Sequence, residues 1–284
     1  MDAVAAHGPL CVGIDPHPGL LAEWGLPDDV GGLERFAMSC VDALAGQVAV
    51  VKPQSAFFER HGSAGVAVLE RVLAALAGTS TLSLLDVKRG DIGSTMDGYA
   101  DAYLGVGAPL AADAITVSPY LGLGSLTSAI RTAEDAGRGV FVLARTSNPE
   151  GAQVQLADWA GRCVAQTVVD GVAALNADTR SGGGARGDTA RSGGGVRGTA
   201  ASFGNVGVVV GAVAAHGLDL SALNGPVLAP GLGAQGARPG DLAARFAGLN
   251  GIVLPSVSRS VLRVGPAAVR AAAAALRDEL AAAG

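Results

Sequence analysis

The amino-acid sequence predicts an α/β fold, a (β/α)8 barrel that occupies residues 1–284 as a single domain. Three observations lead to this fold class. Short runs of Val, Ile and Leu recur along the chain, amphipathic helical patterns separate them, and eight such units fit into 284 residues. Near-continuous apolar runs are typical of parallel strands, because helices cover both faces of such a sheet. A doubly wound open sheet is the alternative, since it has the same alternation of elements.

The eight apolar runs have the length of strands, and the segments between them have the length and spacing of helices. The expected strands are 10–15, 48–53, 81–87, 113–118, 139–145, 206–212, 226–230 and 251–255. The expected helices are 31–46, 62–78, 94–107, 122–136, 154–177, 215–223, 238–247 and 265–282.

Residues 179–203 differ from the rest of the chain in composition. They consist almost entirely of Gly, Ser, Arg, Thr and Ala, and they contain the near-duplicate stretches RSGGGARGDTA and RSGGGVRGTA. Such a segment buries too little apolar surface to offset the entropy lost on ordering. We therefore expect a flexible insertion between the fifth helix and the sixth strand. A Gly- and Arg-rich loop that binds an anion is the alternative.

The overall composition favours a soluble enzyme with a large core. Hydrophobic residues make up 49% of the chain and charged residues 16%, and the net charge is −5. The negative charge argues against a nucleic-acid or anionic-membrane surface, although a few local cations can still bind a small anion. Three widely spaced cysteines indicate free thiols in a reducing compartment. With neither a signal-peptide pattern nor a long apolar run, we expect a cytoplasmic protein.

The use of lysine is unusual. Of 20 cationic side chains, 18 are Arg and only two, Lys52 and Lys88, are Lys. Lysine is compact and gives up a proton when its pKa is lowered, whereas arginine stays charged. In a chain that uses arginine for nearly every cation, the positions that keep lysine are candidates for proton chemistry.

Both lysines lie where predicted strands end, and in a barrel these C-terminal ends face the active site. The first strand ends in Asp15, the second in Lys52 and the third in Asp86 and Lys88, with Asp91 close behind. Asp86 and Lys88 are two residues apart, so an extended strand places them on one face. Acids and amines that alternate in a dry pocket keep each other ionised. A purely structural salt-bridge cluster is the alternative.

A second group of residues has the character of a phosphate site. Pro230 opens the Gly-rich stretch that contains Gln235 and follows the seventh strand, and Arg259 follows the eighth strand. Loops at these two positions of a barrel commonly bind phosphate, through backbone N–H groups and a cation. A Gly-rich turn that only eases packing is the alternative. The polar run that includes Ser147 follows the fifth strand.

Seven segments resemble, in order, the orotidine 5′-phosphate decarboxylase family, in particular its longer bacterial branch. They are VGIDP (12–16), VKPQSAFFE (51–59), LLDVKRGDIGST (84–95), TVSPYLG (116–122), ARTSNPEG (144–151), APGLGAQG (229–236) and SVSRS (256–260). The resemblance implies an enzyme that converts orotidine 5′-monophosphate to uridine 5′-monophosphate in pyrimidine biosynthesis. It also implies a homodimer with shared active sites that needs no metal and no organic cofactor.

The resemblance implies roles for individual residues as well. Asp86 would face the substrate carboxylate, Lys88 would protonate C6 of the pyrimidine, and Lys52 would bridge the ribose and the charged groups. Asp91, with Ile92 and Thr95, would reach into the site of the neighbouring subunit. The other substrate-binding residues would be Asp15 at a ribose hydroxyl, Ser147 at the pyrimidine ring, Gln235 and Arg259 at the 5′-phosphate, and Pro230.

The chain departs from the family pattern at two places. Ser258 stands where many relatives have Gly before the arginine, which bears on how closely the backbone approaches phosphate there. The insertion at 179–203 is unlike the usual family spacing, and it precedes the strands that lead to the phosphate loops.

The implied chemistry agrees with the residue types. Loss of CO2 from C6 leaves a carbanion with little resonance stabilisation, and a fixed ammonium at Lys88 would oppose that charge. Three other functions remain open at this point. They are a metal-dependent sugar-phosphate decarboxylase or hexulose-phosphate synthase, a Schiff-base aldolase that uses a lysine, and a protein that binds a phosphate ligand without turnover.

Overall fold

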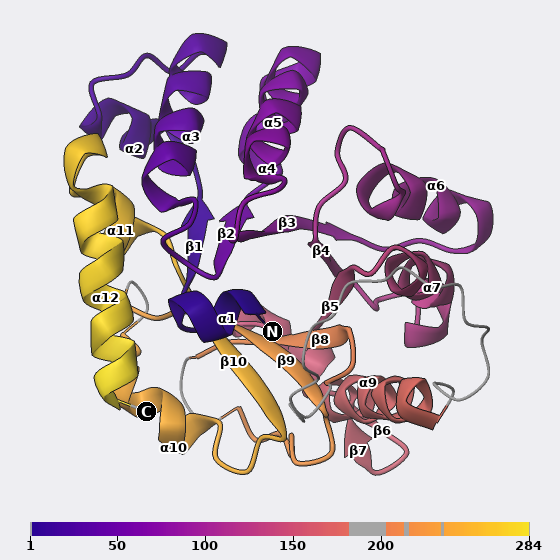
Figure 1. The fold of residues 1–284 in the computed structure, drawn as a ribbon. Helices are drawn as coiled ribbons and strands as arrows, with labels where there is room; N and C mark the ends of the chain where they lie inside the picture. Colours follow the sequence, from indigo (N-terminus) through magenta and orange to yellow (C-terminus); the bar gives the residue numbers. More distant parts are fainter. Residues whose placement is uncertain (1, 182–202, 213–215, 234–235, 284) are drawn as a thin grey trace, which may run out of the picture.

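The computed structural model contains a closed barrel of eight parallel strands, so the predicted fold class is confirmed and the open sheet is excluded. It describes residues 2–181, 203–212, 216–233 and 236–283, with side chains of 178–181 left aside. Around the barrel the strands follow the order β1-β10-β9-β8-β5-β4-β3-β2, so consecutive barrel strands along the chain are neighbours. Figure 1 shows the strands at the centre and the helices outside them.

All eight expected strands form. They are β1 (Cys11–Ile14), β2 (Val50–Pro53), β3 (Leu82–Arg89), β4 (Ala114–Val117), β5 (Gly139–Arg145), β8 (Val206–Val210), β9 (Gly225–Pro230) and β10 (Gly251–Val257). Most of their residues are buried, as the near-continuous apolar runs predict.

Seven of the eight expected helical regions hold a helix of the outer layer. These helices are α3 (Val30–Leu44), α5 (Gly62–Leu76), α6 (Gly93–Leu104), α7 (Thr127–Asp135), α9 (Val164–Ser181), α10 (Pro239–Arg245) and α12 (Val269–Ala283). Short helices accompany them: α1 (Asp2–His7), α2 (Pro18–Glu23), α4 (Ala56–Glu59), α8 (Ala152–Gln155), α11 (Arg259–Leu262) and the 3-10 turns Leu123–Leu126, Pro149–Gly151 and Pro266–Ala268.

The helix predicted at 215–223 is wrong, because residues 216–223 form loops and turns. His216 Nδ1 accepts the N–H of Leu218, and Asp219 Oδ1 accepts the N–H of Ser221. Such bonds from a side chain to the nearby backbone compete with helical hydrogen bonds. The apolar spacing that suggested a helix comes from leucines of this segment that are buried without it.

The helix predicted at 154–177 begins ten residues later than expected. α8 ends at Gln155, and the antiparallel pair β6 (Asp158–Trp159) and β7 (Arg162–Cys163) intervenes before α9. Ala160 and Gly161 both have positive φ, 56° and 83°, which matches the tight two-residue turn of a hairpin. The predicted insertion at 179–203 lies almost entirely outside the described residues.

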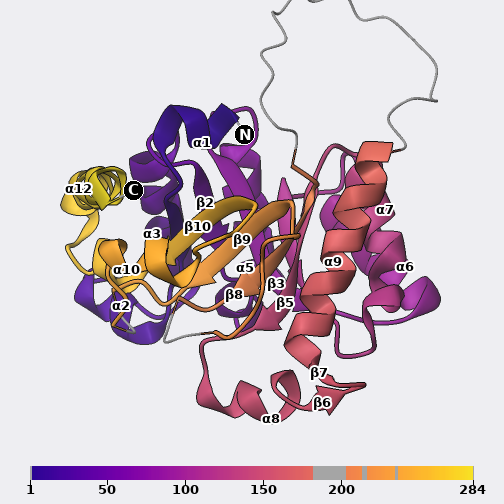
Figure 2. The same cartoon turned by 90° about the horizontal axis from the view of Figure 1, so that it is seen from below.

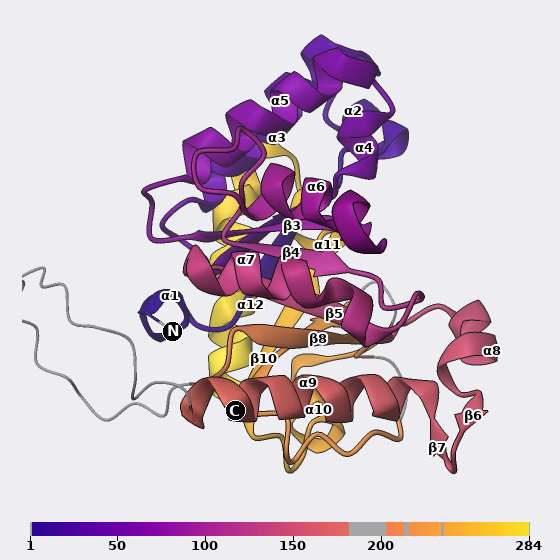
Figure 3. The ribbon, with the colours of Figure 1, turned by 90° about the vertical axis from the view of Figure 1, so that its right-hand side faces the viewer.

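The barrel has an inner and an outer core. The inner cluster includes Cys11, Leu84, Phe141 and Leu228 of the strands. Ala3 of α1 belongs to the same cluster. The outer cluster fills the layer between strands and helices. In Figures 2 and 3, α8 and the β6–β7 hairpin lie at the end of the barrel opposite α1. Among the described residues, no helix is long and apolar enough to cross a membrane.

Candidate active site

The two lysines lie together in a cavity at the C-terminal ends of the strands. Its volume is about 480 Å³, and its lining includes Lys52, Asp86, Lys88, Ser147 and Pro230. A second cavity of about 320 Å³ lies at the opposite end of the barrel. The walls of this second cavity are mainly apolar and contain neither lysine. The candidate active site is therefore the cavity at the C-terminal ends of the strands.

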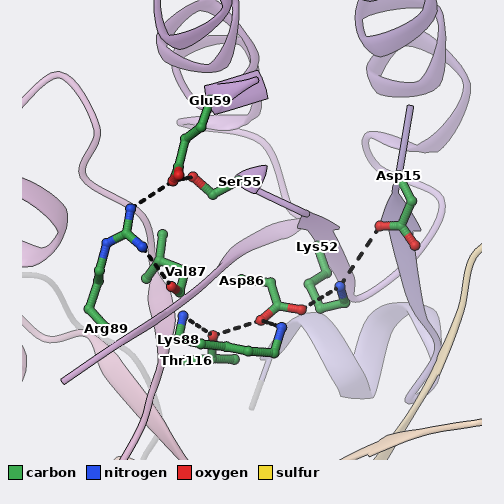
Figure 4. A network of polar contacts seen from close by, with 9 residues as sticks. All are labelled: Asp15, Lys52, Ser55, Glu59, Asp86, Val87, Lys88, Arg89 and Thr116. Carbon is green, nitrogen blue, oxygen red and sulfur yellow. Dashed lines mark hydrogen bonds and ion pairs between the residues drawn. The ribbon is translucent and has the colours of Figure 1, made fainter. Parts of the chain in front are cut away.

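Four ionisable side chains at the C-terminal ends of three neighbouring strands form a charge cluster (Figure 4), and three of them, Lys52, Asp86 and Lys88, line this cavity. Lys52 Nζ lies 3.0 Å from Asp86 Oδ2 and 4.0 Å from Asp15 Oδ1. Lys88 Nζ lies 2.6 Å from Asp86 Oδ1. The side chains of Lys52 and Asp86 are only 10% and 9% exposed, whereas that of Lys88 is 43% exposed. The cluster therefore has a buried part, Lys52 with Asp86, and a more accessible ammonium at Lys88.

The electrostatics keep the buried pair charged. Burial alone raises the pKa of Asp86, but Lys52 and Lys88 together lower this pKa well below its usual range. Burial alone lowers the pKa of Lys52, but Asp86 and Asp15 raise this pKa above its ordinary value. Both groups are thus ionised at neutral pH, as the alternation of acids and amines in the sequence predicts.

Two neutral donors complete the surroundings of the Asp86 carboxylate. Thr116 on β4 donates its hydroxyl to Asp86 Oδ1 at 2.7 Å. With its amide nitrogen turned toward the cluster, Gln54 donates to Asp86 Oδ2 at 2.8 Å and to the Asp86 carbonyl at 3.0 Å. Each carboxylate oxygen thus receives one cation and one neutral donor. Sequence reasoning did not assign Thr116 or Gln54 to the site, although both lie in segments that carry the family resemblance.

The strand that carries Asp86 and Lys88 is not regular where they lie. Lys88 has a φ of 47°, in the left-handed region that non-glycine residues rarely adopt. The β3–β4 pairing shifts register between Leu85 and Arg89. The two side chains meet, as expected, but they do so across a bulge rather than on one face of an extended strand.

Arg89 anchors this bulge from outside the cavity. Its guanidinium donates to the Val87 carbonyl at 3.3 Å and to Glu59 Oε1 at 2.7 Å, and it lies over the rings of Tyr99 and Tyr103. The same Glu59 oxygen accepts the hydroxyl of Ser55 at 2.6 Å. The loop after β2, the end of β3 and helix α6 are therefore joined by one network.

Asp91, Ile92 and Thr95 lie at the start of α6 and are not among the described residues that line the cavity. Asp91 Oδ1 accepts the N–H of Ile92 at 2.8 Å. Ile92 is 62% exposed, and Thr95 is also exposed. Within the described part of one chain, the carboxylate paired with Lys88 is Asp86 alone.

Gln155 holds the start of the loop that carries Ser147. Gln155 of α8 accepts from the backbone N–H of Thr146 at 3.0 Å and donates to its hydroxyl at 2.7 Å. Its oxygen also accepts from Arg145 at 3.0 Å. These bonds fix the backbone directly before Ser147 at the cavity wall.

The structure describes only some of the residues that the sequence places in a phosphate-binding site. Pro230 lines the cavity and Arg259 begins α11 with its side chain exposed, whereas Gln235 lies outside the described residues. A Cβ placed on Gly13 would lie 3.1 Å from Asp15 Oδ1 and 3.2 Å from Ser258 Cβ. The missing side chain at Gly13 therefore lets Ser258 lie beside Asp15.

Among the described residues, no three His, Cys, Asp or Glu side chains are grouped so that they could hold a metal ion.

Comparison with known proteins gives consistent matches over nearly the whole chain. The sequence profile of the Orotidine 5′-phosphate decarboxylase / HUMPS family matches residues 8–275. A protein of Salinispora arenicola named orotidine 5′-phosphate decarboxylase is 57% identical over 275 residues, which are 95% of this chain and 91% of the relative. A protein of the same name from Nocardioides sp. is 52% identical and covers 98% of this chain and 96% of its own length.

Comparison with solved structures also gives matches over nearly the whole chain. A crystal structure from Streptomyces avermitilis, provisionally assigned the same activity, has a TM-score of 0.87 and 51% identity. The match covers 99% of this chain and 93% of that one. The structure of Leishmania donovani OMP decarboxylase has a TM-score of 0.70 at 28% identity and covers 99% and 95% of the two chains.

Proposed function

The chain belongs to the orotidine 5′-phosphate decarboxylase / HUMPS family, and from this premise we propose that it converts orotidine 5′-monophosphate to uridine 5′-monophosphate and CO2. The family resemblance predicted from the sequence is thereby confirmed. The reaction makes the chain a carboxy-lyase of pyrimidine nucleotide biosynthesis. The observation that carries the mechanism is the Lys52–Asp86–Lys88 array in the 480 Å³ cavity.

The chemistry at C6 follows from this array. The bond between C6 and the carboxylate breaks, CO2 departs, and the electron pair stays on C6. The Lys88 ammonium opposes the charge that develops on C6, which is preorganised electrostatic stabilisation. Lys88 then gives a proton to C6, and its amine recovers a proton from water. The net reaction consumes one proton and releases one CO2.

Asp86 acts on the substrate and on Lys88 at once. As an ionised carboxylate with its pKa lowered, it keeps a negative charge near the substrate carboxylate, and this repulsion ends when CO2 leaves. Its contact with Lys88 Nζ at 2.6 Å also holds the ammonium in place until the proton is needed. Lys52, paired with Asp86 and Asp15, holds the carboxylates in place and faces the ribose.

The phosphate end of the substrate lies away from the reacting carbon. Arg259 and Gln235 grip the 5′-phosphate, and Pro230 and Ser147 contact the nucleotide between the two ends. Binding energy from this remote group can organise the reacting end of the site.

We also propose that the chain works as a homodimer in which Asp91, Ile92 and Thr95 complete the site of the partner subunit. Ile92 is 62% exposed, and Tyr120 and Leu121, after the neighbouring strand β4, are 78% and 52% exposed. Large apolar side chains exposed after the neighbouring strands β3 and β4 are suited to an interface. Sedimentation at micromolar concentration tests this directly: a dimer is expected, and a monomer that is fully active contradicts it.

The enzyme functions in the cytoplasm under this proposal, which agrees with the free state of Cys11, Cys40 and Cys163. It uses neither a metal nor an organic cofactor.

A direct assay tests the proposed reaction. Purified chain is mixed with orotidine 5′-monophosphate and a chelator, and the orotate absorbance is followed. Loss of absorbance at the same rate with and without chelator is expected. Activity that requires a divalent metal would favour a metal-dependent sugar-phosphate enzyme, and tight binding without turnover would favour a binding protein. A substrate adduct trapped by borohydride would favour a Schiff-base aldolase.

A further inference from the structure

The hydroxyl of Thr116 contacts two parts of the charge cluster at once. It donates to Asp86 Oδ1 at 2.7 Å and accepts the backbone N–H of Lys88 at 3.0 Å. We propose that Thr116 is a positioning residue that fixes the Lys88 ammonium against the Asp86 carboxylate in the geometry needed for proton delivery. This inference rests on the function proposed above.

The register of the sheet shows why a side chain is needed here. Leu85 on β3 pairs with Ile115 on β4, and Arg89 pairs with Val117. Residues 86–88 therefore stand opposite Thr116 alone, and regular pairing cannot continue through the bulge. At this point, where Lys88 has its φ of 47°, the Thr116 hydroxyl oxygen accepts a hydrogen bond from the Lys88 backbone N–H.

The direction of the two hydrogen bonds is fixed by chemistry. A backbone N–H can only donate, so the hydroxyl oxygen accepts from Lys88. The single hydroxyl proton must then go to Asp86 Oδ1, which favours the ionised carboxylate. The same oxygen receives the Lys88 ammonium at 2.6 Å. Thr116 thereby holds both ends of the Lys88 side chain: its backbone, and the carboxylate that its ammonium contacts.

Packing alone does not fix the ammonium. The Lys88 side chain is 43% exposed, so few neighbours confine its flexible methylene chain. Thr116, in contrast, is 1% exposed and lies within β4. A rigid buried hydroxyl therefore positions a mobile, accessible amine. A small misplacement of a reacting group can lower a rate about 100-fold, because alignment with the reacting atom is lost.

The test compares Thr116→Val with Thr116→Ser in the full-length enzyme. Valine keeps the shape and removes both hydrogen bonds, whereas serine keeps the hydroxyl. We expect kcat for orotidine 5′-monophosphate to fall about 10- to 100-fold in Thr116→Val. KM should change less than about threefold, because the residues proposed to bind the phosphate, Gln235 and Arg259, are unchanged. Thr116→Ser should keep kcat within about threefold of the wild type.

Thr81 provides a matched control. It is also 1% exposed, and its hydroxyl donates to the Val48 carbonyl at 2.7 Å and accepts the N–H of Gly46 at 2.9 Å. It precedes β3, at the far end of the barrel from the cavity. Thr81→Val should lower the urea midpoint about as much as Thr116→Val does and leave kcat unchanged.

The outcomes separate this inference from the proposed function. An active wild type with wild-type kcat in a folded Thr116→Val would overturn the positioning role and leave the decarboxylase proposal standing. Equal losses of kcat in Thr116→Val and Thr81→Val would also overturn it, because both would then act through stability. A wild type without decarboxylase activity would instead remove the proposed function and this inference with it.

Discussion

Replacing Lys52 by Met removes the cation at the centre of the cluster and leaves two carboxylates behind. The Lys52 ammonium lies 3.0 Å from Asp86 and 4.0 Å from Asp15. At an effective dielectric constant of about 20, these distances correspond to attractions of about 5.5 and about 4 kcal/mol. The cost of desolvating the buried ammonium offsets much of this attraction.

The net effect of the substitution is set by the charge that stays buried. Asp86 is 9% exposed, and among the described residues Lys88 is the cation that it keeps, while Asp15 loses its ion pair with Lys52. Removing one partner of a buried ion pair typically lowers the free energy of unfolding by about 3–5 kcal/mol. We expect a loss of this size for Lys52→Met at pH 7, measured by urea unfolding with circular dichroism.

The pH dependence has a definite sign. In the wild type, Asp86 has a lowered pKa, so its contribution is present above its ordinary pKa and is lost only as the pH falls through the lowered value. Lys52 has a raised pKa, so its contribution is present below its ordinary pKa and is lost only as the pH rises through the raised value. The pair therefore stabilises the fold across the neutral range.

In Lys52→Met the pKa of Asp86 rises, because burial remains and one cation is gone. Asp86 should take up a proton at a higher pH than in the wild type, so the difference in stability from the wild type should shrink as the pH falls. Arg71→Met is the control, since the Arg71–Glu34 pair is 49% and 41% exposed and should contribute little. A variant as stable as the wild type, or a difference independent of pH, would refute the reasoning.

Three further outcomes are expected. Lys88→Ala should lose nearly all decarboxylation and lower the urea midpoint less than Lys52→Met does, because the Lys88 side chain is 43% exposed and Lys52 still pairs with Asp86; normal turnover would remove Lys88 from its assigned role. Arg259→Ala should raise KM for orotidine 5′-monophosphate and weaken competition by inorganic phosphate, and unchanged values of both would contradict the phosphate grip. Mixed dimers of Lys88→Ala and Asp91→Ala subunits should recover part of the activity, because one of the two shared sites is then intact. No recovery in dimers verified by mass spectrometry would argue against shared sites.

The barrel was predictable because its strands are read from local composition. A parallel strand covered on both faces needs a continuous apolar run, and each of the eight runs in this sequence forms one. The segment at 215–223 was misjudged because burial of Leu218, Leu220 and Leu223 gives helix-like spacing in a loop. The hairpin within 154–177 depends on the turn at Ala160 and Gly161, where both residues have left-handed backbone geometry. An alanine in the sequence does not predict this geometry.

The charged residues of the site were predictable for a different reason. Strand ends converge in a barrel, so Asp15, Lys52, Asp86 and Lys88 could be brought together from their positions alone. The bulge at Lys88 could not be predicted in this way, since it arises from pairing with β4. The roles of Thr116, Gln54 and Arg89 likewise depend on contacts between strands and helices that are far apart in sequence.

The most direct test of the account is a crystal structure of the enzyme with uridine 5′-monophosphate bound, in which the distance from Lys88 Nζ to C6 is measured. We expect this distance to be about 3–3.5 Å, the separation of groups poised to react. An amine held more than about 6 Å from C6, with the phosphate seated near Arg259, would contradict the claim that Lys88 delivers the proton.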